Sequence, residues 1–183
     1  MFARLFRRDT ESGAIASALY GAIVAAARRP ALYSGLGVAD TVEGRFEMVV
    51  LHTVLVLDRL EKAKAPEQAV GQKVFDLYCV DMDRSLRELG IGDLGVPKRM
   101  KKMTEGFYGR AAAYRAAIAA GDREALAAAI ARNVFPGEAE APGATPLAAY
   151  VLASAAAIAA APPLANPVPF ADPAAFLPAG AAA

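Results

Sequence analysis

One almost uninterrupted apolar stretch restricts the fold of this chain more than any other feature. Between Phe46 and Leu60, apolar side chains cover most of the circumference of a helix. Such a helix is stable in water only when other elements cover it on nearly every side. The segment from about Thr41 to Lys62 is therefore predicted to be the central, most buried helix of the protein.

Helical patterns also dominate the rest of the chain, and strand patterns are scarce. Further helices are expected at about residues 10–29, 66–89, 97–120, 123–134 and 145–161. We expect an all-α fold, a single-domain helical bundle of about five to seven helices. Residues 1–9 form a basic amphipathic segment before the helical domain (residues 10–161), and the Pro/Ala-rich residues 162–183 after it are expected to be disordered.

Three polar side chains are predicted to cap helix N-termini. Asp40 stands three residues before Glu43, which is the spacing of a capping box at the start of the central helix. Asp122 and Thr145 precede the last two predicted helices in the same way.

Composition excludes several classes of site. The 183 residues hold 20 Lys or Arg against 19 Asp or Glu, so a net charge of +1 gives no overall attraction to nucleic acid, and no DNA partner is expected. The single cysteine, Cys79, allows neither an intrachain disulfide nor a cysteine-cluster metal site.

Two apolar segments have some features of membrane or export signals. The N-terminal run is interrupted by Asp9 and Glu11 and is followed by Arg28 and Arg29, which argues against a signal peptide. The alanine-rich segment 146–161 is shorter than the roughly 20 residues that a membrane span needs. We expect it to be a packed helix.

A glycine turn separates two helices in the middle of the chain. GIGDLG, from Gly90 to Gly95, has the G-x-G-x-x-G spacing of a dinucleotide-binding turn. That motif requires a preceding strand, whereas here an amphipathic helix precedes it. We therefore interpret Gly90 as a helix C-cap and expect no bound cofactor.

Four cationic side chains follow this turn within five positions: Lys98, Arg99, Lys101 and Lys102. At 100° per residue they lie opposite an apolar stripe that includes Met100 and Phe107, so they are expected to face solvent. A solvated helix face, a protein partner, anionic lipid headgroups and RNA phosphate all remain open as explanations.

Residues for catalysis are few. His52, the only histidine, lies in the most apolar helix and is interpreted as a hydrogen-bonded core residue. Asp81 and Asp83 diverge by about 200° on a helix and cannot share a metal ion, and Cys79 lies on an apolar face. We expect no enzyme; a helical ligand-binding domain or enzyme around His52 is the alternative.

The N-terminal segment 1–9 allows two interpretations. It is either an interfacial anchor on anionic lipid or the start of a helix that docks on the bundle. The candidate membrane contacts are Phe2, Arg4, Leu5, Phe6, Arg7 and Arg8.

Two blocks of the sequence resemble a known family. The first, ALYSGLGVADTVEGRFEMVVLHTVLVLDRL, runs from Ala31 to Leu60, and the second, DMDRSLRELGIGDLGVPKRMKKMTEGFYGR, runs from Asp81 to Arg110. Both are similar to the ubiquinol–cytochrome c chaperone family and occur in the same order. The resemblance extends over about residues 18–133 and leaves out the last helix and the tail.

The resemblance implies a non-enzymatic assembly chaperone that binds newly made cytochrome b of ubiquinol–cytochrome c reductase. Mitochondrial members also associate with the ribosome, together with a smaller partner protein. This chain resembles a bacterial homologue, expected in the cytoplasm or peripheral on the inner face of the inner membrane. A ribosome- or RNA-binding module that uses the Lys98–Lys102 face is the competing hypothesis.

The charged joint around the glycine turn is then the expected client-docking surface. A client with hydrophobic helices and charged loops needs an apolar groove with a charged rim. The residues predicted to contact it are Asp83, Arg84, Arg87, Lys98, Arg99, Met100, Lys101, Lys102, Met103, Phe107, Tyr108 and Arg110.

Overall fold

A computed structural model describes residues 2–138 and 141–178 of the chain, with side chains from Thr10 onward. Its described residues form helices and no strand, which confirms the all-α, single-domain prediction. The helices are α1 (Phe2–Ala27), α2 (Val42–Glu61), α3 (Ala65–Glu88), α4 (Val96–Ala120), α5 (Arg123–Val134) and α6 (Ala144–Ala160). A π-helical turn (Ala31–Gly35) follows α1, and a 3₁₀ turn (Pro173–Phe176) follows α6.

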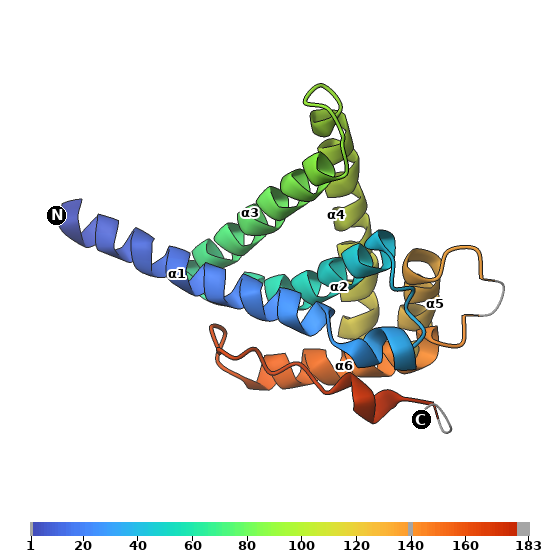
Figure 1. Cartoon of the computed structure of the whole chain (residues 1–183). Coiled ribbons are helices and arrows are strands. Elements are labelled where there is room, and N and C mark those ends of the chain that lie inside the picture. Colours follow the sequence, from blue (N-terminus) through green and yellow to red (C-terminus); the bar gives the residue numbers. More distant parts are fainter. Residues whose placement is uncertain (1, 139–140, 179–183) are drawn as a thin grey trace.

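Helix α2 forms the centre of the bundle, as the sequence predicts. Every residue from Glu47 to Val56 is buried, and α2 packs against α1, α3, α4, α5 and α6. In Figure 1, α2, α3 and α4 lie along three sides of a triangle, and α3 and α4 meet at a turn that projects from the body.

Helix α1 is longer than expected and begins at Phe2, because no helix-breaking residue stands before Thr10. Among the described residues, one segment, Thr10–Gly35, is long and apolar enough by composition to cross a membrane. Leu19 and Ile23 of this segment are buried in the core, and the core helix of a bundle meets the same criterion.

The expectation of a disordered tail is wrong for residues 162–178. Val168 and Phe170 are buried. The Arg29 guanidinium donates to the Ala171 carbonyl oxygen at 2.6 Å, and the Ser154 hydroxyl accepts from the Ala171 amide at 3.1 Å. The tail is therefore part of the packed structure.

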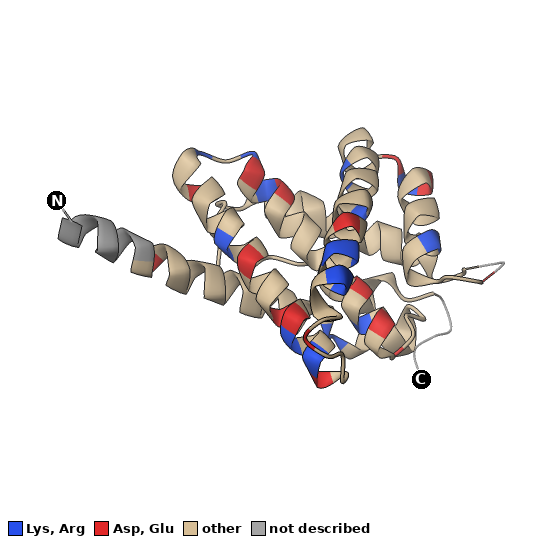
Figure 2. Ribbon diagram, turned by 90° about the horizontal axis from the view of Figure 1, so that it is seen from above, with Lys and Arg blue, Asp and Glu red and all other residues tan. Residues whose placement is uncertain are grey.

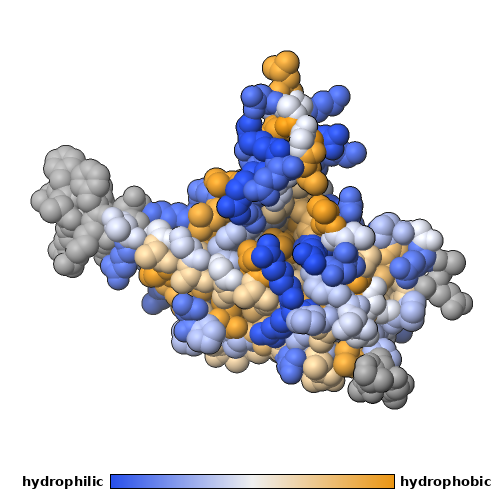
Figure 3. Space-filling view, in the orientation of Figure 1, coloured by the Kyte–Doolittle hydropathy of each residue, from blue (hydrophilic) through white to orange (hydrophobic). Residues whose placement is uncertain are grey.

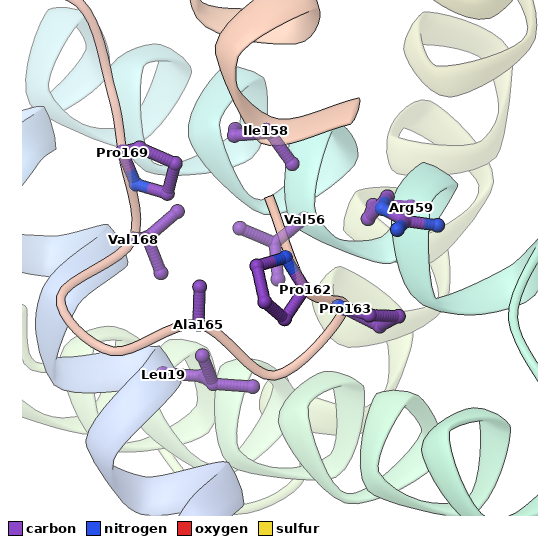
Figure 4. A pocket seen from close by; sticks show the side chains of 9 residues that line it. All are labelled: Leu19, Val56, Arg59, Ile158, Pro162, Pro163, Ala165, Val168 and Pro169. Atoms are coloured by element: carbon purple, nitrogen blue, oxygen red, sulfur yellow. The ribbon is translucent and has the colours of Figure 1, made fainter. Parts of the chain in front are cut away.

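Alanine-rich α6 explains why the tail packs. Its small side chains leave apolar surface uncovered between α1, α2 and α6. Figure 4 shows Leu19, Val56 and Ile158 directed toward a space that Val168 of the tail closes. Prolines in the tail reduce the conformational entropy lost on packing. Composition alone had indicated disorder because it does not show this uncovered surface.

Two of the three predicted caps are wrong. Asp122 caps α5 as predicted, accepting from the Ala125 amide at 2.9 Å. In α2, however, Thr41 is the cap and accepts from the Gly44 amide at 3.1 Å, while Asp40 pairs with Arg45 instead. Thr145 lies inside the first turn of α6, whose N-cap is Gly143 and lacks a side-chain bond.

The predicted C-cap at Gly90 is confirmed. Its φ is +80°. Its amide donates to the Arg87 carbonyl at 2.9 Å, and the Ile91 amide donates to the Leu86 carbonyl at 3.2 Å. These two bonds form a Schellman motif that ends α3. The glycine turn thus fixes the joint between α3 and α4.

We predict that Gly90→Ala lowers the free energy of unfolding by about 1 kcal/mol, because a Cβ disfavours positive φ. Gly92→Ala is the matched control, since Gly92 lies in the same turn without positive φ and has open space around it. The control should change stability by less than about 0.5 kcal/mol. Equal losses in urea unfolding of the two variants would contradict the structural role of Gly90.

Candidate functional site

The predicted docking residues lie on α3 and α4, but the structure divides them into separate groups. The four cations of α4 are exposed near the α3–α4 turn. Phe107 and Tyr108 lie further along α4, where they line a groove. Arg110 faces α2, where it binds Glu47, and does not line the groove. These residues therefore do not form one continuous site.

The charged residues of α3 mostly pair with one another. Arg87 donates to Asp83 at 2.6 Å and also pairs with Asp93 of the turn. Arg84 pairs with Asp81 and lies 3.9 Å from Glu88. Asp83–Arg87 and Arg84–Glu88 are both pairs of residues four apart on the helix. Exposed pairs of this kind stabilise a helix by only about 0.3–0.5 kcal/mol.

The groove is lined by α2, α3 and α4 and has a volume of about 390 Å³. Its apolar lining comes from all three helices and consists of Leu57, Gly71, Phe75, Phe107, Tyr108 and Ala111. Its polar lining consists of Glu61, Gln68, Gln72 and Arg115. The site therefore combines an apolar floor with a polar rim.

Aromatic rings form one wall of this groove. The Phe75 ring lies 5.2 Å from that of Phe107 and 5.8 Å from that of Tyr108. Phe107 is buried, Phe75 is half-buried and Tyr108 is 59% exposed. The exposed Tyr108 ring thus extends a buried aromatic cluster to the surface of the groove.

The groove narrows where α3 approaches α2. A Cβ added to Gly71 would lie 3.2 Å from the Leu60 Cβ, so glycine permits the close contact of the two helices. The rim is held on the other side by Arg115, which lies 2.7 Å from Glu61 and 3.5 Å from Asp58.

Sequence reasoning missed the α2 and α3 parts of the groove. Phe107 and Tyr108 were predicted as docking residues, but Leu57 and Gln72 were not. Leu57 and Gln72 lie far from α4 in the sequence, and only tertiary packing brings them close to that helix. Gly71, a glycine within the amphipathic α3, was the one local signal that α3 lies close to another helix.

Arg110 forms an internal ion pair instead of a docking contact. Its guanidinium donates to both carboxylate oxygens of Glu47, at 2.7 and 2.6 Å. The Arg110 side chain is 23% exposed and that of Glu47 is 9% exposed. Burial raises the pKa of Glu47, and the hydrogen bonds from Arg110 oppose that rise. This pair ties α4 to the central helix directly beside the aromatic wall.

His52 is a core residue, as predicted. Its side chain is fully buried; Nδ1 lies 2.7 Å from the Met48 carbonyl and Nε2 2.7 Å from the Tyr150 hydroxyl. The carbonyl can only accept, so Nδ1 carries the proton of the neutral ring and Nε2 accepts from Tyr150. The Phe170 ring of the tail covers the imidazole edge-on at 5.0 Å.

The other candidate chemical groups also have structural surroundings. Asp81 accepts from the Tyr20 hydroxyl at 2.8 Å, whereas Asp83 pairs with Arg87, so the two carboxylates diverge as predicted. Burial raises the pKa of the half-buried Cys79 thiol, which disfavours the reactive thiolate. Within the described residues, no three acidic, histidine or cysteine side chains gather as a metal site.

Comparison with known proteins identifies the family. A family model described as ubiquinol–cytochrome C chaperone matches residues 34–164, well over half of the chain. The chain belongs to the ubiquinol–cytochrome c chaperone family. The family match covers α2 to α6 and thus all helices that line the groove. The resemblance stated from the two sequence blocks is confirmed.

A solved structure supports the same assignment. The crystal structure of the Cbp3 homolog from Brucella abortus is 42% identical to this chain, with a TM-score of 0.86. The alignment covers 95% of this chain and 98% of the Brucella chain. No curated protein sequence matches the chain.

We predict that Arg110→Ala lowers the free energy of unfolding by about 3 kcal/mol, because it leaves the Glu47 carboxylate buried without a partner. The double variant Glu47→Leu/Arg110→Met should recover most of that loss. Arg84→Ala, which removes an exposed pair, is the control and should cost less than about 1 kcal/mol. Urea unfolding measures all three, and a loss for Arg110→Ala no larger than the control's would contradict the role of this pair.

We also predict acid destabilisation through His52. Burial lowers the pKa of His52 to about 4, whereas the unfolded chain keeps about 6.5. The unfolded state therefore binds the extra proton first, and stability present above pH 6.5 is lost as pH falls toward 4. The loss should reach about 3 kcal/mol.

His52→Gln is the matched variant for this prediction. Because His52 is the only histidine in the chain, no other imidazole contributes to the difference between the variant and the wild type. Its unfolding free energy should vary less between pH 6.5 and 4 than that of the wild type, whatever its absolute stability. Parallel pH profiles for the two proteins would show that His52 titrates normally in the folded state.

Proposed function

We propose that this protein is a non-enzymatic chaperone that binds cytochrome b in the groove between α2, α3 and α4. Family membership supports a role in the assembly of ubiquinol–cytochrome c reductase. The observation that carries the proposal is the aromatic wall of Phe75, Phe107 and Tyr108, of which Tyr108 is exposed, beside a polar rim.

The groove suits a segment of a membrane protein. An unassembled transmembrane helix presents apolar side chains that must be kept from water, and an amphipathic groove accepts such side chains at helical spacing. A volume of about 390 Å³ is within the range of ordinary ligand pockets, which start at about 300 Å³. The polar ends or loops of the same segment can form hydrogen bonds with Gln68, Gln72 and Arg115.

The client-docking set predicted from sequence is narrowed accordingly. Phe107 and Tyr108 stay in it, joined by Phe75 and Leu57. Arg110 is assigned to the ion pair with Glu47. Met100 and Met103, half-buried on α4 between the groove and the turn, extend the apolar surface along the helix; flexible methionine side chains suit an adaptable contact.

The alternatives have weaker support. A ligand-binding site or enzyme around His52 would need access to the imidazole, and Met48, Tyr150 and Phe170 enclose it. A ribosome- or RNA-binding module would use the exposed α4 cations and leave the aromatic groove without a role. RNA binding would weaken steeply with salt, whereas binding of an apolar segment in the groove would not.

We predict that Tyr108→Asp reduces cytochrome b capture by at least tenfold, because it places a charge in the aromatic wall of the groove. Val80→Asp is the matched control: Val80 is 66% exposed on α3 and does not line the groove. Both variants should fold, since the side chains are exposed. The measurement is affinity capture from solubilised native membranes followed by quantification of cytochrome b. Equal capture by Tyr108→Asp and wild type would place the client elsewhere.

A further inference from the structure

Exposed apolar side chains occupy the outermost part of the α3–α4 joint. Leu94 is 99% exposed and Leu89 is 58% exposed. Figure 1 shows this turn projecting from the body, and Figure 3 shows hydrophobic atoms at its end with hydrophilic side chains next to them. A fully exposed leucine buries no apolar surface and so adds little to the stability of the fold.

The first turns of α4 supply positive charge beside these leucines. Lys98, Arg99, Lys101 and Lys102 are all exposed. Lys101 lies 3.9 Å from Glu105, but in the described part of the chain the other three have no acidic partner within 4 Å. Figure 2 shows acidic and basic residues interspersed over the ribbon, whereas four of the five positions from Lys98 to Lys102 are basic, so this run is a local excess of positive charge.

Two acidic residues near the tip, Asp83 on α3 and Asp93 in the turn itself, share the guanidinium of Arg87. The turn is closed by the Schellman bonds of Gly90 and by the Gly95 amide donating to the Gly92 carbonyl at 2.8 Å. These bonds hold both ends of the turn and fix the position of Leu94 between them.

We propose that the α3–α4 tip is a membrane contact that places Leu94 and Leu89 among the headgroups of an anionic lipid leaflet. The cations of α4 would lie at the headgroup level, where each one near an anionic surface adds attraction. Apolar residues at the end of a projection with a cationic belt behind them have the arrangement of an interfacial anchor. This inference does not depend on the client in the groove.

The observations favour lipid over RNA. RNA phosphates would pair with the cations alone, and the leucines would remain in water. A lipid interface uses both sets of residues, because acyl chains and anionic headgroups lie within one layer.

The test is sedimentation of the full chain with vesicles. One set contains phosphatidylcholine with an equal amount of phosphatidylglycerol, and the other contains phosphatidylcholine alone. The variants are Leu94→Asp and Lys98→Gln/Lys102→Gln. Val80→Asp, which introduces the same charge on α3 away from the tip, is the control.

The wild type and the control should sediment with the anionic vesicles and much less with the neutral ones. The double glutamine variant should bind about 25-fold more weakly, at roughly fivefold for each cation. Leu94→Asp should bind at least tenfold more weakly through lost insertion. Circular dichroism should be unchanged, because these side chains are exposed.

Undiminished vesicle binding by both tip variants would assign any membrane contact to another surface, such as the N-terminal segment, and overturn the proposal. Failure of the wild type to bind anionic vesicles would overturn the proposal as well. A third contradictory result would be that the wild type and Leu94→Asp both bind a homopolymer RNA and neither binds vesicles. Tyr108→Asp separates the two proposals, since it should lose cytochrome b and keep vesicle binding.

Discussion

Burial of α2 is the constraint on which the rest of the structure depends. From Glu47 to Val56 this helix has no side chain in solvent, and five helices cover it. Each fully buried Val or Leu contributes about 1.5–3 kcal/mol relative to an exposed one. Because α5, α6 and the C-terminal tail cover one side of α2 and α1 covers another, α3 and α4 pack on what remains and extend beyond the body.

The groove follows from this arrangement. α3 and α4 meet at the Gly90 turn and are held at α2 by different contacts: Gly71 lets α3 approach Leu60, and Arg110 on α4 binds Glu47. Apolar surface between the two helices is consequently left uncovered, with Phe75 and Tyr108 on its wall. The same geometry that stabilises the bundle thus leaves a partly apolar site open for a partner.

Sequence patterns predicted the elements of this fold better than their contacts. The central helix, the Gly90 C-cap and the core position of His52 follow from local periodicity and turn chemistry, which the sequence displays directly. The predicted disorder of the tail was wrong because its order depends on a surface that exists only after packing. Two cap assignments were wrong because α2 and α6 begin one or two residues away from the predicted starts. The docking residues were likewise assigned together to one joint between two helices, whereas Arg110 points to α2 and Tyr108 to the groove.

The claim that the groove holds cytochrome b is tested most directly by site-specific photocrosslinking in cells. A photoreactive amino acid would replace Tyr108 in one strain and Val80 in another, and the crosslinked partners would be identified by mass spectrometry. The account predicts a cytochrome b adduct from position 108 and none from position 80. Adducts to ribosomal proteins alone, or equal cytochrome b adducts from both positions, would contradict it.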